Sequence, residues 1–164
     1  MKIVLTLACF FIVNISVAQK LFSDKCIGNW KGVMKIYSKG ILKDTVTVLL
    51  TIQKQTDTSW MWKTEYISTK IPVTKNYKLR LKDKANGIYV TDEGDGIELK
   101  DYLFDDKLYS VFETEGIMLT SFYELRGKQL YFEVTSGKKI MEDAKEVVNY
   151  SVNNVQKVVF KKIK

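Results

Sequence analysis

The groups that could carry chemistry in this 164-residue chain are its carboxylates, hydroxyls, aromatic rings and thiols, because the sequence contains no histidine. The absence of imidazole excludes a Ser-His-Asp triad, a Cys-His pair and a histidine-ligated zinc or haem. Paired carboxylates remain as an acid–base route, but sequence alone does not show two of them facing across a cleft. Cys26 has no histidine to activate it, so we expect a partly buried, inert thiol. The composition favours binding over catalysis, and we expect neither an enzyme nor a cofactor.

One acidic segment has the composition of a calcium-binding loop. Residues 92–96 read Asp-Glu-Gly-Asp-Gly and are followed by Glu98. Oxygen ligands and glycines suit calcium, but the spacing departs from the Asp-x-Asp-x-Asp-Gly loop with its distal glutamate. We therefore expect a hairpin turn here and no metal site.

Aromatic residues at alternating positions are the most distinctive candidates for binding. Trp60, Trp62 and Tyr66 share one face of a predicted strand. Rings from other predicted strands can join them inside a closed barrel: Tyr77, Phe112, Tyr123, Phe132 and Phe160. Such rings either line a pocket for an apolar or flat ligand or fill the interior, and the alternation does not distinguish the two cases.

A basic segment follows the first of these aromatic groups. Its charged residues are Lys75, Lys78, Arg80, Lys82 and Lys84. The intervening apolar side chains are expected on the opposite, buried face, so the charges lack the exposed stacking rings that nucleic-acid binding uses. We interpret the segment as a solvated face and expect no nucleic-acid partner. The alternative is an anionic component of the cell envelope, such as polysaccharide or acidic lipid headgroups.

The elements that must position these residues are short strands with a period of two. We predict them at 27–37, 45–55, 59–69, 77–82, 87–91, 97–104, 107–114, 117–125, 129–135, 147–152 and 155–162. The last two are expected to be joined by a tight turn at Asn153-Asn154, and residues 141–150 are compatible with either helix or strand. The fold class is all-β, a single antiparallel meander barrel of about 8–10 strands with little helix, because closure removes exposed strand edges.

The N-terminal residues 1–18 have the pattern of a signal peptide. Lys2 precedes a mostly apolar run over 3–15, and Ser16-Val17-Ala18 predicts cleavage after Ala18. Cleavage would remove Cys9, leave one thiol and no internal disulfide, and lower the formal net charge of +7 by one. We expect an exported protein, periplasmic or extracellular, with one barrel domain over 19–164 and no membrane span after the leader is removed.

The start of the first predicted strand, Gly28-Asn29-Trp30, resembles the Gly-x-Trp signature of the lipocalins and calycins. The resemblance implies that Trp30 plugs the closed end of the barrel and that a basic residue of the last strand, Lys161 or Lys162, covers its ring. The chain also looks like small exported lipocalin-like proteins of the Bacteroidetes, most of which have no assigned activity.

Two functions follow from these features. The first is an exported, non-enzymatic, lipocalin-like barrel that binds a small hydrophobic or amphipathic molecule. Its ligand-binding residues would be Trp60, Trp62, Tyr66, Tyr77, Phe112, Tyr123 and Phe132. The alternative is a protein-interaction or inhibitor module of the cell envelope with a filled barrel, which would use its loops and basic strand.

Overall fold

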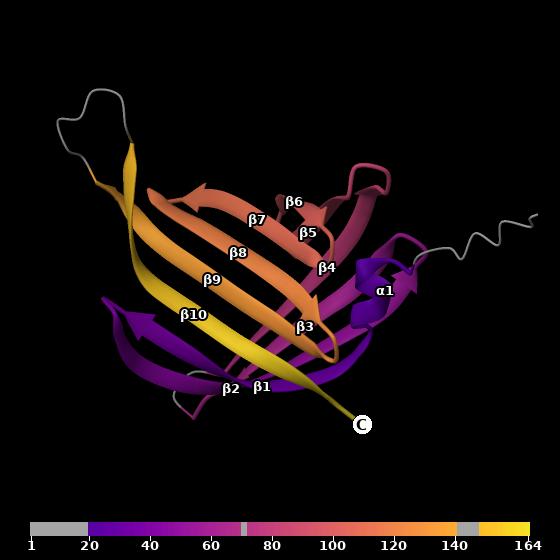
Figure 1. Ribbon diagram of the computed structural model, residues 1–164, viewed down its shortest axis with the longest axis horizontal. Helices are drawn as coiled ribbons and strands as arrows, with labels where there is room; N and C mark the ends of the chain where they lie inside the picture. Colours follow the sequence, from indigo (N-terminus) through magenta and orange to yellow (C-terminus); the bar gives the residue numbers. More distant parts are fainter. Residues whose placement is uncertain (1–19, 70–71, 141–147) are drawn as a thin grey trace, which may run out of the picture.

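The protein is a closed antiparallel barrel of ten strands with one short helix, seen in a computed structural model that describes residues 20–69, 72–140 and 148–164. Each strand pairs with the next along the chain, and β1 closes the barrel against β10 (Figure 1). The elements are α1 (Phe22–Cys26), β1 (Gly28–Ser38), β2 (Ile41–Thr56), β3 (Ser59–Ile67), β4 (Val73–Asp83), β5 (Ile88–Gly94), β6 (Ile97–Phe104), β7 (Lys107–Thr114), β8 (Ile117–Arg126), β9 (Gln129–Ile140) and β10 (Asn149–Ile163). The predicted all-β meander barrel is confirmed.

The alternation of apolar and polar residues produces the barrel because successive side chains of a strand point to opposite faces. In β2, Val48, Leu50 and Ile52 are fully buried, whereas the residues between them are more exposed. The expected hairpin at residues 92–96 is also confirmed, since β5 ends at Gly94 and β6 begins at Ile97.

The predicted turn at Asn153-Asn154 is wrong. These residues lie inside β10, which runs without a break from Asn149 to Ile163, so the two strands predicted at 147–152 and 155–162 are one. The β9 partner advances by one residue while β10 advances by two, from Val152 to Asn154, which is the geometry of a β-bulge. Asparagine here bends a strand that has neighbours on both sides and does not end it. Residues 149 and 150 are strand, and residues 141–147 lie outside the described residues.

Helix α1 lies at one end of the barrel and closes it (Figure 1). The helix lacks an amphipathic repeat, which needs more than its five residues, so sequence periodicity does not reveal it. Phe22 and Cys26 are buried against the barrel core. The Trp30 indole Nε1 donates a hydrogen bond to the Cys26 carbonyl at 2.8 Å, which ties the helix to the start of β1. Among the described residues, no helix is long and apolar enough to cross a membrane.

The last strand covers Trp30, as the resemblance implies. Lys162 Nζ lies 5.0 Å from the centre of the Trp30 ring, so Lys162, and not Lys161, occupies this position. Gly28 has a φ of 137°, and a Cβ at this residue would overlap Cε of Lys162. The Gly-x-Trp spacing therefore lets the lysine side chain reach the indole.

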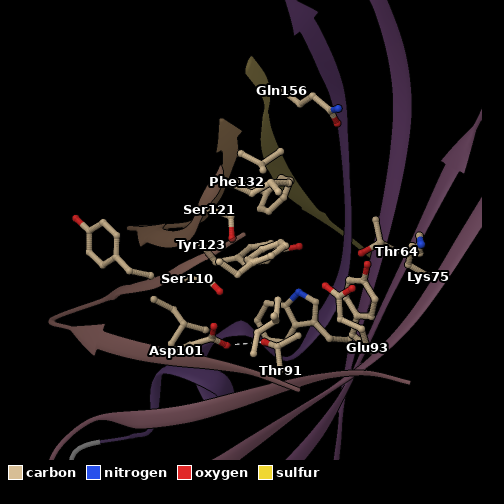
Figure 2. Close-up of a pocket in the computed structure, with 18 of the residues that line it drawn as sticks. Thr64, Lys75, Thr91, Glu93, Asp101, Ser110, Ser121, Tyr123, Phe132 and Gln156 are labelled. Atoms are coloured by element: carbon tan, nitrogen blue, oxygen red, sulfur yellow. Dashed lines mark hydrogen bonds between the residues drawn. The ribbon is translucent and has the colours of Figure 1, made fainter. Parts of the chain in front are cut away.

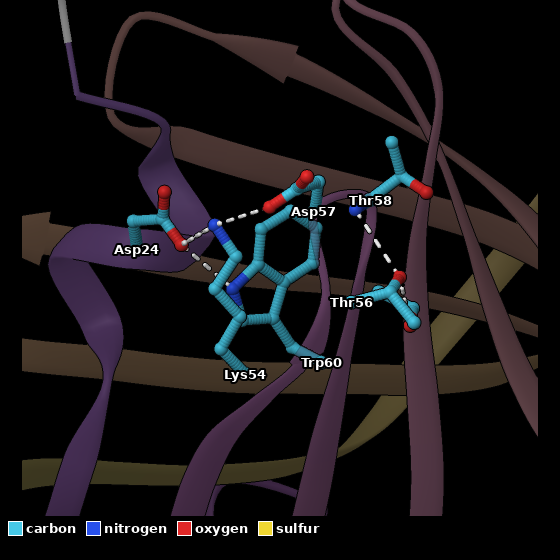
Figure 3. A network of polar contacts seen from close by, with 7 residues as sticks. Asp24, Lys54, Thr56, Asp57, Thr58 and Trp60 are labelled. Atoms are coloured by element: carbon cyan, nitrogen blue, oxygen red, sulfur yellow. Dashed lines mark hydrogen bonds and ion pairs between the residues drawn. The ribbon is translucent and has the colours of Figure 1, made fainter.

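A second tryptophan, Trp60, also forms a hydrogen bond with α1 (Figure 3). Trp60 Nε1 donates to Asp24 Oδ1 at 2.9 Å, and Trp60 is fully buried. Lys54 Nζ lies 3.7 Å from the same oxygen and 3.5 Å from Asp57 Oδ1. The α1 end of the barrel is thus a packed core, which leaves the opposite half of the interior available for a site.

Candidate functional site

The half of the barrel away from α1 contains a cavity of about 470 Å³ (Figure 2). Its wall on one side is formed by residues of β7 to β10 that lie at matching positions across the sheet. From the level nearest α1 to the far end these are Leu108, Tyr123 and Phe132; then Ser110, Ser121, Val134 and Gln156; then Phe112, Leu119, Ser136 and Asn154. The facing wall comes from β3 to β6 and includes Trp62, Thr64, Tyr66, Tyr77, Leu79 and Thr91.

All the aromatic candidates except Trp60 and Phe160 line this cavity. They are Trp62, Tyr66, Tyr77, Phe112, Tyr123 and Phe132. Trp60 shares the inward face of β3, but it lies at the level of α1 and packs against Tyr89, with 6.5 Å between ring centres. Phe160 is likewise part of the packed core. Alternation along a strand identifies the inward face, but the level at which the core ends depends on α1, which the alternation does not reveal.

Three of these rings form a continuous wall. The Trp62 and Tyr123 rings meet edge to face with centres 5.1 Å apart, and the Tyr123 and Phe132 rings are 4.5 Å apart. Burial raises the pKa of the Tyr123 hydroxyl above its usual range, so it stays neutral and can act as a donor or an acceptor. The wall therefore offers flat apolar surface with hydroxyl groups at its margin.

A buried carboxyl group in the cavity was missed by the sequence analysis. Asp101 on β6 is only 2% exposed, and its Oδ2 accepts a hydrogen bond from Thr91 Oγ1 at 2.6 Å (Figure 2). Its other oxygen, Oδ1, has no hydrogen-bond partner among the described residues. Ser110 on the other neighbouring strand is near enough to lower the pKa of Asp101, but the two form no hydrogen bond of regular geometry. Burial dominates and raises the pKa of Asp101.

The sequence did contain a sign of this residue. Leu99, Asp101 and Leu103 alternate on one face of the strand predicted at 97–104, so an acidic residue interrupts an apolar inward face. Such an interruption marks either a surface strand or a buried polar group, and only the barrel shows that this face points inward.

Toward the far end of the cavity the lining becomes charged. Glu93 and Lys75 both line it, and burial, followed by the charge of Glu93, raises the pKa of Tyr77 to about 12. Burial also raises the pKa of Tyr66. The expectation that Lys75 belongs to an outward basic face is wrong, because residue 75 has the same parity as Tyr77 and Leu79 and so points inward.

The rest of the basic segment is partly neutralised. Arg80 forms ion pairs with Glu98 and, at 3.9 Å, with Asp92. In the parts of the chain that the structure describes, no group of acidic or cysteine side chains is arranged to hold a metal ion.

Comparisons with known proteins find similarity only at the level of structure. No protein-family model and no curated protein sequence matches the chain. The S-type phycobiliprotein lyase CpeS from Guillardia theta aligns with a TM-score of 0.65 at 8% identity, over 87% of this chain and 91% of that one. A protein of unknown function of the DUF3598 family from Nostoc punctiforme aligns with a TM-score of 0.59 at 14% identity, over 86% of this chain and 49% of that one.

A third similar structure is Rv2717c from Mycobacterium tuberculosis, with a TM-score of 0.50 at 10% identity over 84% of this chain and 92% of that one. At these identities the likeness shows a shared barrel fold and assigns no family.

Proposed function

We propose that this protein is an exported, non-enzymatic barrel that holds one small hydrophobic or amphipathic ligand in its cavity. The observation that carries the proposal is the cavity of about 470 Å³ walled by Trp62, Tyr123 and Phe132. Its volume lies within the range of about 300–1,000 Å³ typical of small-molecule sites. The lining combines apolar and aromatic surface with a few inward polar groups, which is the composition that such sites share.

The comparisons show a shared fold and do not decide between binding and catalysis. The similar structure from Guillardia theta is named as a lyase of phycobiliproteins, so barrels of this shape also occur among enzymes. We favour binding for this chain because it contains no histidine and because Asp101, the buried carboxyl group of the cavity, is hydrogen-bonded to a threonine hydroxyl and not to another carboxyl group. Export rests on the sequence of residues 1–18, and the expected mature N-terminus is Gln19.

The alternative, an interaction module of the envelope with a filled barrel, has less support. The interior is packed only at the α1 end, and the basic strand on which it would depend loses Lys75 to the cavity and pairs Arg80 with carboxylates.

The test is a titration of the purified mature protein with N-phenyl-1-naphthylamine, a neutral lipophilic fluorophore. We expect saturable enhancement of its emission with one probe per chain, because transfer from water to an apolar wall is favourable. Ser121→Phe places a ring into the middle of the cavity and should weaken binding at least about tenfold, equivalent to about 1.4 kcal/mol.

The matched control is Val111→Phe, at a side chain that is 64% exposed on the adjacent strand. It adds the same ring outside the barrel and should leave the affinity unchanged. Absence of saturable binding in the wild type, or equal binding by the two folded variants, would contradict the proposal.

A further inference from the structure

Asp101 has an unusual environment for a buried acidic residue. Buried charges in proteins are nearly always paired with an opposite charge or a metal, because removing an ion from water is costly. Asp101 is 2% exposed, and no lysine or arginine of the described residues forms an ion pair with it. Its two neighbouring strands supply no positive charge: β5 places the Thr91 hydroxyl and backbone and the like charge of Glu93 near it, and β7 places the Ser110 hydroxyl.

The unpaired atoms of this group are buried in the wall of the cavity. Asp101 and Ser110 both line it, and Asp101 Oδ1 and Ser110 Oγ are buried without hydrogen-bond partners in the described structure. Figure 2 shows the two side chains next to each other in the wall of the cavity. An ammonium group has three donors and no acceptor, so it can satisfy both oxygens at once.

The surroundings are also favourable to a cation. The faces of Trp62 and Tyr123 carry negative quadrupole potential, and Glu93 adds a second acidic group to the lining. Lys75 is the only basic side chain among the lining residues, and it lies opposite Thr64 in the β3–β4 register, two residues toward the far end from Trp62.

We propose that the cavity selects ligands that join an apolar or aromatic body to a protonated amine, and that Asp101 Oδ1 receives the amine. The inference rests on the proposed binding function and specifies its ligand class. The amine supplies a cation for Asp101, which forms no ion pair with the described residues, and the aromatic wall contacts the apolar body. Burial raises the pKa of Asp101, and a bound ammonium favours its ionised form.

The experiment compares three fluorescent probes with the same ring system at pH 7 by isothermal titration calorimetry. They are 1-pyrenemethylamine, which is protonated, 1-pyrenemethanol, which is neutral, and 1-pyrenecarboxylate, which is anionic. We expect the wild type to bind the amine at least about tenfold more tightly than the alcohol. Asp101→Asn should remove that preference while the affinity for the alcohol changes by less than about twofold.

Two further variants assign the effect to one residue. Glu98→Gln removes an exposed carboxylate from the same strand outside the cavity and should retain the preference. Glu93→Gln removes the second acidic group of the lining and should retain most of it. A preference that survives in Asp101→Asn but disappears in Glu93→Gln would overturn the assignment to Asp101.

The wild-type comparison is informative even if a variant fails to fold. Equal affinity for the amine and the alcohol, or tighter binding of the carboxylate through Lys75, would overturn the amine proposal and leave the binding function intact. Absence of binding by all three probes would count against both proposals.

Discussion

Replacing Asp101 by asparagine is expected to stabilise the folded protein at neutral pH. Burial raises the pKa of Asp101 above its ordinary value of 3.8. Between that ordinary value and the raised one, the folded state keeps a proton that the unfolded state has lost, so the free energy of unfolding falls as pH rises. Above the raised pKa, the loss of stability caused by burying the ionised carboxylate is complete and no longer changes with pH. Asparagine has no proton to lose and avoids this penalty at every pH.

The size of the effect follows from the contacts of the two oxygens. The asparagine amide oxygen can keep the hydrogen bond from Thr91, which spans 2.6 Å in the wild type. The gain comes at Oδ1, because a buried acceptor without a partner costs about 1–3 kcal/mol, and more when it is charged, whereas the amide nitrogen of asparagine can donate to the neighbouring Ser110 Oγ. We therefore expect Asp101→Asn to raise the free energy of unfolding by about 1–3 kcal/mol at pH 7.5. At pH 3, where both states are protonated, the difference should fall below about 1 kcal/mol.

Urea unfolding followed by tryptophan fluorescence, at pH 3 and at pH 7.5, measures this difference. Each kcal/mol should also raise Tm by about 2–4 °C in a chain of this size. Asp95→Asn is the control, because it makes the same chemical change in the exposed turn after β5. Its effect should be small and nearly equal at the two pH values. The stability gain of Asp101→Asn over the wild type should be larger at pH 7.5 than at pH 3. If it is not, the charge of Asp101 is paired in the folded protein and our account of the cavity is wrong.

Three further predictions concern the closed end and the bulge. Lys162→Met should cost about 0.5–1 kcal/mol through the lost contact with Trp30. Gly28→Ala should cost about 1–3 kcal/mol because φ is positive and because the added Cβ would overlap Cε of Lys162. Its cost should therefore be smaller in a Lys162→Ala background, which removes Cε, and strictly additive changes in the free energy of unfolding in urea would count against the coupling. Cys26, fully buried with its pKa raised to about 12 by burial, should react with 5,5′-dithiobis(2-nitrobenzoate) at pH 8 only after denaturation, so rapid labelling of the native protein would contradict its placement. Gly137→Ala should lower Tm through a loss of about 1–3 kcal/mol, because its Cβ would overlap backbone atoms at the bulge of β10, and an unchanged Tm would show that the strand can move.

The strands could be predicted because their signal is local. Alternation in β2 and the turn residues between β5 and β6 depend on neighbours within a few residues, and the structure follows both. The Asn153-Asn154 turn failed for the opposite reason. Two asparagines tolerate a tight turn, but the pairing of β10 with β1 and β9 on both sides keeps them in one strand.

In the candidate site, too, some features have a local signal in the sequence and others depend on the tertiary structure. The alternation of side chains along a strand correctly predicts that Trp62 and Tyr123 point inward. The same alternation places Lys75 inward, although its charge suggested an outward face together with Lys78 and Arg80. Trp60 has the same parity as Trp62 but lies outside the cavity, because α1 fills the barrel at its level.

The sequence by itself determined the all-β class, the meander order, the inward face of strongly alternating strands such as β2 and the exclusion of imidazole chemistry, since these depend on residue type and a period of two. Only the tertiary structure decided that the interior is filled at one end and hollow at the other, and that Asp101 lies in the hollow half with one oxygen unpaired. The physical reason is that burial and pairing depend on what strands distant in sequence place against a side chain. The five-residue helix α1 and the arrangement of the ten strands determine which residues are neighbours, and neither leaves a periodic pattern in the sequence.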